Sequence, residues 1–123
     1  YEKAHAGLPL VQHSLQLMLH YVNEGKISME KVVEKMSHAV ATCFQIKERG
    51  FIREGYFADL VLVNMNQQQT VSKENILYKC GWSPLEGFTF PATITNTFVS
   101  GNLVYGNGEW NESHKGMRLQ FNR

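Results

Sequence analysis

The residues of this sequence best suited to chemistry are its five histidines: His5, His13, His20, His38 and His114. A zinc site requires three or four ligands that converge on one point. The sequence contains no His-x-His or His-Glu-x-x-His pattern, and no histidine lies four residues from another. His13 and His20 lie seven residues apart and could share a helix face, but two ligands do not make a site. We therefore expect the histidines to lie at the surface or to cap helices, and we expect this chain to bind no metal.

Nucleophilic and acid–base groups are equally isolated. Cys43 and Cys80 form neither a Cys-x-x-Cys motif nor a disulfide framework, and neither has a base near it in sequence, so we expect two reduced, structural thiols. Asp59 is the only aspartate and precedes an apolar run, where this residue usually caps a turn or the backbone. Gly50 and Gly55 precede a strand rather than a helix, which argues against a phosphate-binding loop. The residues alone predict no self-contained active site.

Composition places the chain among folded globular proteins. Hydrophobic residues make up 43% of the 123 residues and charged residues 19%, which argues against intrinsic disorder. The formal net charge of +1, with scattered basic and acidic residues, argues against nucleic acid as the main partner. No apolar stretch approaches the ~20 residues of a membrane helix and no leader opens the chain, so we expect a cytoplasmic protein without membrane contact. Residues 1–9 contain no initiating Met and read like the middle of a loop, which favours a piece of a longer protein.

The first half of the sequence is patterned for helices. Apolar residues recur every three to four positions over residues 10–21, after Pro9 and before Gly25, which predicts an amphipathic helix. Ser28 is a suitable N-cap for a second helix, with Glu30 in the first turn, where the helix dipole favours negative charge. This helix, and a short helix expected after it, carry an apolar face made of Met29, Val32, Val33, Met36, Ala39, Val40, Cys43 and Phe44.

The second half is rich in glycine and in residues that favour strands. Leu60–Val63 is a continuous apolar run, which predicts a strand buried on both faces. Thr93–Val99 alternates as a half-buried strand does. Ser100–Asn102 then predicts a turn and Leu103–Tyr105 a returning strand, so we expect a β-hairpin.

Three further stretches complete the pattern. Residues 72–78 are expected to hold one helical turn. Residues 111–123 are expected to form a last edge strand or a docked tail, because Met117, Leu119 and Phe121 alternate with polar residues. The organisation is α+β, with the change from helix to strand near residues 46–50.

Several segments together resemble one enzyme family over roughly residues 1 to 110. Gly50–Val63 is similar to a signature of the wider amidohydrolase superfamily, which includes hydantoinases, allantoinases, ureases and deaminases. Lys79–Gly87, taken with the opening loop and helix Lys3–His13, resembles dihydroorotases in particular. The remaining similar segments are Glu34–His38, Phe44–Ile46 and Thr97–Tyr105.

The resemblance implies a fold and a reaction. Residues 1–46 would be the loop and C-terminal helices of a (β/α)8 amidohydrolase barrel, and residues 47–123 the C-terminal part of the small flanking β-sandwich domain. Dihydroorotases reversibly hydrolyse the cyclic amide of dihydroorotate to N-carbamoyl aspartate in pyrimidine biosynthesis. They use zinc at the C-terminal mouth of the barrel to activate water and polarise the amide, with an Asp from an Asp-x-x-Pro-His motif as the proton shuttle. These ligands and this Asp correspond to positions before Tyr1, so zinc is expected in the full-length enzyme and the isolated chain is expected to be inactive.

The same resemblance assigns one contribution to the opening loop. Dihydroorotases bind substrate through backbone groups just before and at a loop glycine, which correspond to Ala6 and Gly7. A glycine that merely permits a turn is the alternative for Gly7. The sequence departs from the family pattern at His5, where proline is common, and at Gln12, where many relatives carry glutamate.

Three readings of function remain open from the sequence. The first is the C-terminal part of a dihydroorotase, whose partners would be the missing N-terminal part, dihydroorotate and further copies in a homo-oligomer. The second is a non-catalytic, structural dihydroorotase-like subunit. The third is another cyclic amidohydrolase of the hydantoinase or allantoinase type. Barrel helices without their strands would expose an apolar face, so we expect oligomerisation or association with the missing part.

Overall fold

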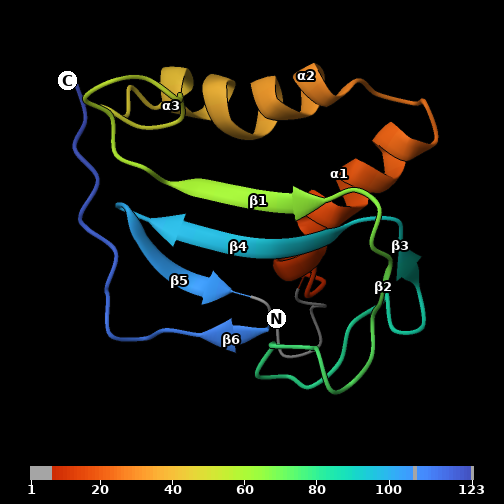
Figure 1. The fold of residues 1–123 in the computed structure, drawn as a ribbon. Helices are drawn as coiled ribbons and strands as arrows, with labels where there is room; N and C mark the ends of the chain where they lie inside the picture. Colours follow the sequence, from red (N-terminus) through yellow and green to blue (C-terminus); the bar gives the residue numbers. More distant parts are fainter. Residues whose placement is uncertain (1–6, 107, 123) are drawn as a thin grey trace, which may run out of the picture.

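The computed structural model describes residues 7–106 and 108–122 and has the α+β character that the sequence predicts (Figure 1). Three helices come first: α1 (Ser14–Asn23), α2 (Met29–Val33) and α3 (Ala39–Cys43). Strands follow: β1 (Leu60–Asn64), β2 (Gln69–Thr70), β3 (Thr89–Phe90), β4 (Thr93–Val99), β5 (Asn102–Gly106) and β6 (Glu109–Trp110). The change from helix to strand lies in the loop between α3 and β1.

Helix α1 lies where the sequence predicts a helix, although its α-helical part begins at Ser14 rather than at Leu10. A 3-10 turn over Val11–His13 leads into it, which extends the helical stretch back towards Pro9. Gly25 terminates it with φ of +70°, a backbone conformation that glycine adopts without strain. The helix buries Gln16 and Leu19, and its other residues are partly or fully exposed. The prediction of an amphipathic helix here is confirmed.

The second helical segment runs from Met29 to Cys43 and is called the long helix below. The Oγ of Ser28 caps it by accepting a hydrogen bond from the Lys31 N–H at 3.2 Å, as predicted. Glu34–His38 form a π-helical turn that joins α2 to α3. The two helices expected from the sequence are therefore one continuous segment.

The loop after the long helix lies directly on it at Gly50. A Cβ added to Gly50 would lie 2.4 Å from the Ala41 Cβ and 3.1 Å from the Ser37 carbonyl oxygen. Gly50 also has φ of +80°, which other L-residues rarely adopt. Only glycine permits this close approach of loop to helix.

The strands form an antiparallel sheet in the order β1-β4-β5-β6. Val99 pairs with Asn102, so the β4–β5 turn has two residues, Ser100 and Gly101. Their φ angles of +51° and +85° are those that a type I′ turn requires. The predicted hairpin is confirmed.

Strand β1 is where the structure departs most from the sequence prediction. The strand itself is confirmed, but within residues 7–106 and 108–122 it lies at the edge of the sheet and pairs only with β4. Val61 is 46% exposed and Leu62 is 49% exposed, so the prediction that β1 is buried on both faces is wrong for this chain. The alternation expected for β4 is also absent, because every residue of β4 is partly exposed.

Residues 72–78 do not form the helical turn that the sequence suggested. The Asn75 N–H donates to the Ser72 carbonyl at 3.1 Å, while the Asn75 Oδ1 accepts from the Ser72 N–H at 2.9 Å. This reciprocal pair closes a turn, because an asparagine side chain competes with the backbone partners that a helix would use. The segment follows the small sheet formed by β2, which pairs with β3 further along the chain.

The end of the chain forms the docked tail that was one of two expectations. It runs from β6 along one side of the molecule to the end of the long helix (Figure 1). The Lys47 N–H donates to the Gln120 carbonyl at 2.9 Å, and the Asn122 N–H donates to the Gln45 carbonyl at 2.9 Å. These bonds tie the tail to the loop that follows α3.

The buried core is small. Among the described residues six apolar side chains are buried: Leu19, Val32, Ala41, Val71, Phe90 and Ala92. Phe90 is fully buried and packs edge-on against Phe88, with ring centroids 4.9 Å apart. This aromatic part of the core lies between α1 and the β2–β3 sheet.

Candidate functional site

The predicted substrate-binding loop is described only from Gly7 onward. Ala6 lies outside the described residues. Gly7 is exposed, and a Cβ added to it would meet no heavy atom within 4 Å. Gly7 therefore has no packing reason to be glycine in this chain, and substrate contact through its backbone stays a prediction.

Gln12 fixes the end of this loop to a distant part of the chain. Its side-chain Nε2 donates to the Asn75 carbonyl at 2.7 Å, and its Oε1 accepts from the Leu77 N–H at 2.9 Å. The Gln12 backbone N–H donates to the Tyr78 hydroxyl at 2.9 Å. These bonds hold the turn before α1 against the segment of residues 75–78, which directly precedes Lys79–Gly87 in the sequence.

A glutamate at position 12 could not reproduce this arrangement. A carboxylate accepts from the Leu77 N–H but cannot donate to the Asn75 carbonyl. The sequence marked Gln12 only as a departure from the family pattern. Gln12 is separated from Asn75 by 63 positions and from Leu77 by 65 positions, so no local sequence pattern could predict these contacts.

His13 is a buried side chain that sequence reasoning placed wrongly. It is 3% exposed, stacked on Phe90 with ring centroids 5.8 Å apart and set edge-on to Tyr78 at 6.1 Å. Its Nδ1 is buried and has no hydrogen-bond partner among the residues that the structure describes. Burial lowers the pKa of the imidazole from its ordinary value, because the charged form loses its hydration. His13 is therefore a neutral core histidine rather than a surface or capping one.

The described residues do not fit a metal centre. No group of three or more His, Cys, Asp and Glu side chains comes together in the described part of the chain. His20 lies 3.3 Å from the Glu24 carboxylate, and His38 stacks on Phe51 with ring centroids 4.4 Å apart. Each of these two imidazoles contacts a neighbour of its own, and the two do not form part of one ligand group among the described residues. No metal-dependent step is therefore assigned to residues of this chain.

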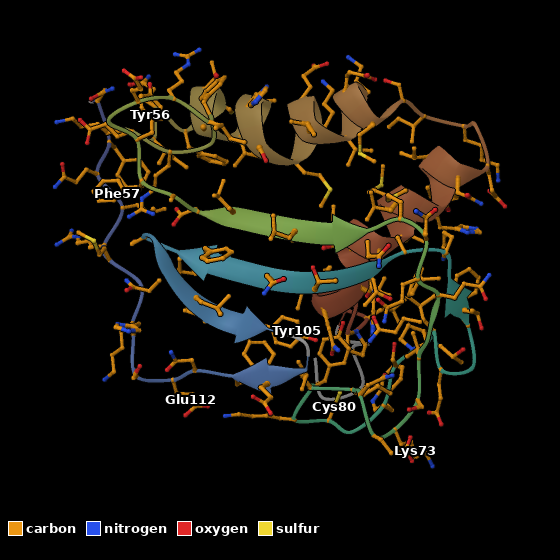
Figure 2. All side chains as sticks on the ribbon, viewed as in Figure 1. Tyr56, Phe57, Lys73, Cys80, Tyr105 and Glu112 are labelled. Atoms are coloured by element: carbon orange, nitrogen blue, oxygen red, sulfur yellow. The ribbon has the colours of Figure 1, made fainter. Side chains whose placement is uncertain are left out.

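The two cysteines are free thiols, and both are exposed. Cys43 ends α3 (Figure 1), whereas Cys80 lies in the loop between β2 and β3, towards the bottom of Figure 2. The Cys80 Sγ donates a weak hydrogen bond to the Trp82 carbonyl at 3.6 Å. These two surface thiols lie at separate ends of the fold and form no common site in the described part of the chain.

Asp59 has the backbone-capping role predicted for it, together with a partner that was not predicted. Its Oδ1 accepts from the Ser100 N–H at 2.7 Å, which holds the β4–β5 turn against the start of β1. Its Oδ2 is ion-paired with Arg49, which is 7% exposed and also donates to the Ser100 Oγ at 3.2 Å. Arg49 further lies over the Phe57 ring, 4.3 Å from its centroid. This cluster is structural, because each charge is neutralised by a fixed neighbour.

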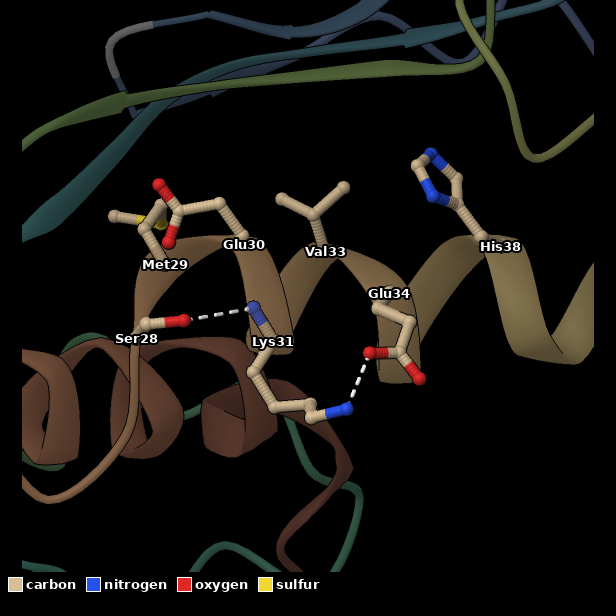
Figure 3. A pocket seen from close by; sticks show the side chains of 7 residues that line it. All are labelled: Ser28, Met29, Glu30, Lys31, Val33, Glu34 and His38. Carbon is tan, nitrogen blue, oxygen red and sulfur yellow. Dashed lines mark hydrogen bonds and ion pairs between the residues drawn. The ribbon is translucent and has the colours of Figure 1, made fainter.

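A concave feature lies between the long helix and β1, and it is called the groove below. It has a volume of about 770 Å³, and its lining is mainly apolar, including Val33, Met36, Ile52, Val61, Val63 and Met65. A smaller adjoining pocket of about 530 Å³ shares Met29, Val33 and His38 with it. In Figure 3 these three side chains point towards the strands, whereas Lys31 and Glu34 pair on the other side of the helix. The chemistry of the groove suits an apolar occupant rather than a polar reaction.

No helix in the described part of the chain is long and apolar enough to cross a membrane.

Comparison with known proteins places these features in a family. Residues 8–104 match the Amidohydrolase family. The dihydroorotase of Pyrococcus horikoshii is 35% identical over 118 residues, which is 96% of this chain and 28% of that protein. An allantoinase of Desulfitobacterium hafniense is 32% identical over 104 residues, or 84% of this chain and 23% of that protein.

Solved structures show the same relationship. The L-hydantoinase from Arthrobacter aurescens is 30% identical with a TM-score of 0.79, and the match covers 89% of this chain and 25% of that one. This chain spans about a quarter of the length of the curated relatives that it matches. The family model covers most of the sequence, and the dihydroorotase match includes almost all of it. The chain therefore belongs to the amidohydrolase family and is dihydroorotase-like over nearly its whole length.

Proposed function

We propose that this chain is the carboxyl-terminal part of a longer dihydroorotase, which reversibly hydrolyses the cyclic amide of dihydroorotate to N-carbamoyl aspartate. The observation that carries the proposal is the 35% identity to a dihydroorotase across 96% of this chain. The match of residues 8–104 to the Amidohydrolase family supports it as well.

In this proposal the work is divided between this chain and the rest of the protein. The helices would cover the end of a (β/α)8 barrel, and the strands would complete a small β-sandwich domain. Zinc and the aspartate that transfers protons would belong to the rest of the protein, because the described residues offer no ligand set. This chain would supply backbone groups at Ala6 and Gly7 that orient the substrate ring.

The test of the proposal is an assay of the longer protein in both directions. The protein would be purified, its bound zinc counted, and its activity measured with dihydroorotate, N-carbamoyl aspartate, hydantoin and allantoin. We expect turnover of the first two and no turnover by the pure 123-residue chain with added zinc. Turnover by the isolated chain would refute the division of labour, and a zinc-free, inactive longer protein would favour a structural subunit.

A second candidate is a cyclic amide hydrolase of different specificity. The L-hydantoinase structure and the allantoinase relative are at least 30% identical to this chain, so the similarity alone separates the substrates poorly. Higher kcat/KM for hydantoin or allantoin than for dihydroorotate would favour this candidate.

The contribution of Gly7 can be tested separately in the longer protein. Gly7→Pro removes the backbone N–H, whereas Gly7→Ala retains it and adds a Cβ that meets nothing within 4 Å in this chain. If that N–H binds substrate, we expect Gly7→Pro to lower kcat/KM about 5- to 100-fold, the loss of one hydrogen bond to a polar ligand. Gly7→Ala is the matched control and should stay near wild type. Equal activity of the two variants would leave Gly7 as a turn residue only.

A further inference from the structure

The connection between Gly7 and the first helical turn is short and stiff. Residues 8–10 join Gly7 to the 3-10 turn Val11–His13. Pro9 lies within this connection, and a proline fixes its own φ at about −65° and restricts the residue before it to an extended conformation. The Leu10 carbonyl accepts from the His13 N–H at 3.1 Å. Whatever fixes the first turn therefore also limits where the backbone of Gly7 can lie.

This first turn receives its cap from a distant tyrosine. The N-cap residue is Leu10, whose side chain has no acceptor for the free N–H groups at the start of a helix. The Gln12 N–H donates instead to the Tyr78 hydroxyl at 2.9 Å. The Tyr78 ring also lies edge-on to His13, with ring centroids 6.1 Å apart. The ring and the hydroxyl of Tyr78 thus hold the turn at two points.

The Gln12 side chain ties the same turn to Asn75 and Leu77. Its Nε2 donates to the Asn75 carbonyl at 2.7 Å, and its Oε1 accepts from the Leu77 N–H at 2.9 Å. Asn75 is itself fixed, because its Nδ2 donates to the Thr70 carbonyl at 2.8 Å and its Oδ1 accepts from the Ser72 N–H at 2.9 Å. A chain of hydrogen bonds, called the relay below, therefore runs from β2 through Asn75 to Gln12.

We propose that Gln12 is a positioning residue of the hydrolase, which acts through the backbone of Gly7 with Tyr78 as its second support. This inference rests on the proposed function, in which the Gly7 backbone orients the substrate ring. Gly7 is exposed and Leu8 is 63% exposed, so packing does little to hold the loop in place. The relay supplies the missing restraint at the far end of a stiff connection. Because a displacement of about 1 Å can cost about a hundredfold in rate, this restraint affects turnover without touching the substrate.

The first test is a double-mutant cycle in the longer protein. Gln12→Met keeps the length of the side chain and removes its bonds to Asn75 and Leu77. We expect it to lower kcat/KM for dihydroorotate about 10- to 100-fold, through the same parameter, kcat or KM, that Gly7→Pro changes. In the Gly7→Pro background it should cost less than about twofold, because it acts through a contact that is already lost. No loss with Gly7 intact, or equal losses in the two backgrounds, would overturn the proposal.

Gln16→Met is the matched control for a loss of stability. Gln16 lies on the same helical stretch, one turn further from Gly7, and its Nε2 donates to the Gln69 Oε1 at 2.6 Å and to the Ala92 carbonyl at 3.3 Å. We expect Gln16→Met to lower Tm yet to keep kcat/KM within about twofold of wild type. A loss of kcat/KM as large as that of Gln12→Met would overturn the positioning role.

Tyr78→Phe tests the second support. It removes the hydroxyl that accepts from the Gln12 N–H and keeps the ring beside His13. We expect kcat/KM to fall about 2- to 10-fold, the loss of one hydrogen bond. An unchanged kcat/KM would remove Tyr78 from the proposal.

Hydrogen exchange by mass spectrometry tests the relay without substrate. In the longer protein, peptides that cover residues 7–13 should exchange at least about fivefold faster in Gln12→Met than in wild type or Gln16→Met, because the turn loses its restraint. Equal exchange in the three proteins would overturn the proposal. Faster exchange, together with turnover of hydantoin or allantoin in place of dihydroorotate and the same result of the cycle on that substrate, would refute the proposed substrate alone and support the positioning role.

Discussion

His13 combines deep burial with an unsatisfied nitrogen. Its ring lies between Phe90 and Tyr78, and the Nδ1 finds no partner among the described residues. A protonated imidazole would lose its hydration there, which is why burial lowers the pKa of His13. Burial therefore favours the neutral form of the ring.

The lowered pKa of His13 in the folded state predicts how stability depends on pH. Because the folded-state pKa of His13 lies below its unfolded value of about 6.5, the unfolded chain binds more protons as the pH falls. The contribution of His13 is therefore complete above pH ~6.5 and is lost as the pH falls through and below that value, with a slope of at most about 1.4 kcal/mol per pH unit. Urea unfolding between pH 5 and 8 measures it.

His13→Asn is the control for this prediction. Asparagine keeps a polar group near the Nδ1 position but does not titrate in this range. The difference in unfolding free energy between wild type and variant should change below pH 6.5 and stay constant above it. A constant difference over the whole range would contradict a lowered pKa for His13.

Residue-scale predictions from the sequence succeeded where the cause is local. Ser28 caps the long helix by accepting from the Lys31 N–H, three positions further on. Asp59 also caps backbone as predicted, but it caps Ser100, 41 positions away, which the sequence did not indicate. The burial of His13 and the pairing of Arg49 with Asp59 were not foreseen. Both depend on segments that only the tertiary fold brings together.

At the scale of elements, the strands themselves were predicted correctly, whereas the burial of β1 was not. The β4–β5 hairpin was predictable because Ser100 and Gly101 specify its turn. The burial of β1 was not, because it depends on which strands are its neighbours. The candidate site shows the same difference. Gly7 was predicted from the resemblance to a family, whereas the groove could be found only once the structure placed the long helix beside β1.

The contact between the long helix and its following loop gives a prediction about Gly50. Gly50→Ala would strain a φ of +80° and drive a Cβ into Ala41, whereas Gly55→Ala would strain a φ of +81° in open space. We expect Gly55→Ala to lose about 1–2 kcal/mol, and Gly50→Ala to lose at least about 1–3 kcal/mol more because of overpacking. Urea unfolding of both variants gives the difference. Equal losses would mean that the loop moves off the helix freely.

At the scale of the whole molecule, the apolar content exceeds what these residues bury among themselves. Hydrophobic residues make up 43% of the chain, yet six apolar side chains are buried in its described part. Many large ones, including Phe44, Ile52 and Leu62, stay exposed. A core of this size leaves a narrow margin over the entropy of the unfolded chain. The isolated chain should therefore tolerate core damage poorly.

Phe90 is the side chain on which that margin depends most. It is fully buried and contacts both Phe88 and His13, so it joins β3 to α1 and its leading turn. Truncation of a buried phenylalanine costs about 3–5 kcal/mol, comparable to the entire stability of a weakly packed domain. We expect Phe90→Ala to abolish the cooperative thermal transition of the isolated chain. Phe44→Ala, at a site 55% exposed, should retain that transition within a few degrees. In the longer protein, whose added contacts enlarge the core, Phe90→Ala should remain folded with a lowered Tm. If the isolated Phe90→Ala chain also folds, the stability of the isolated chain does not depend on this core.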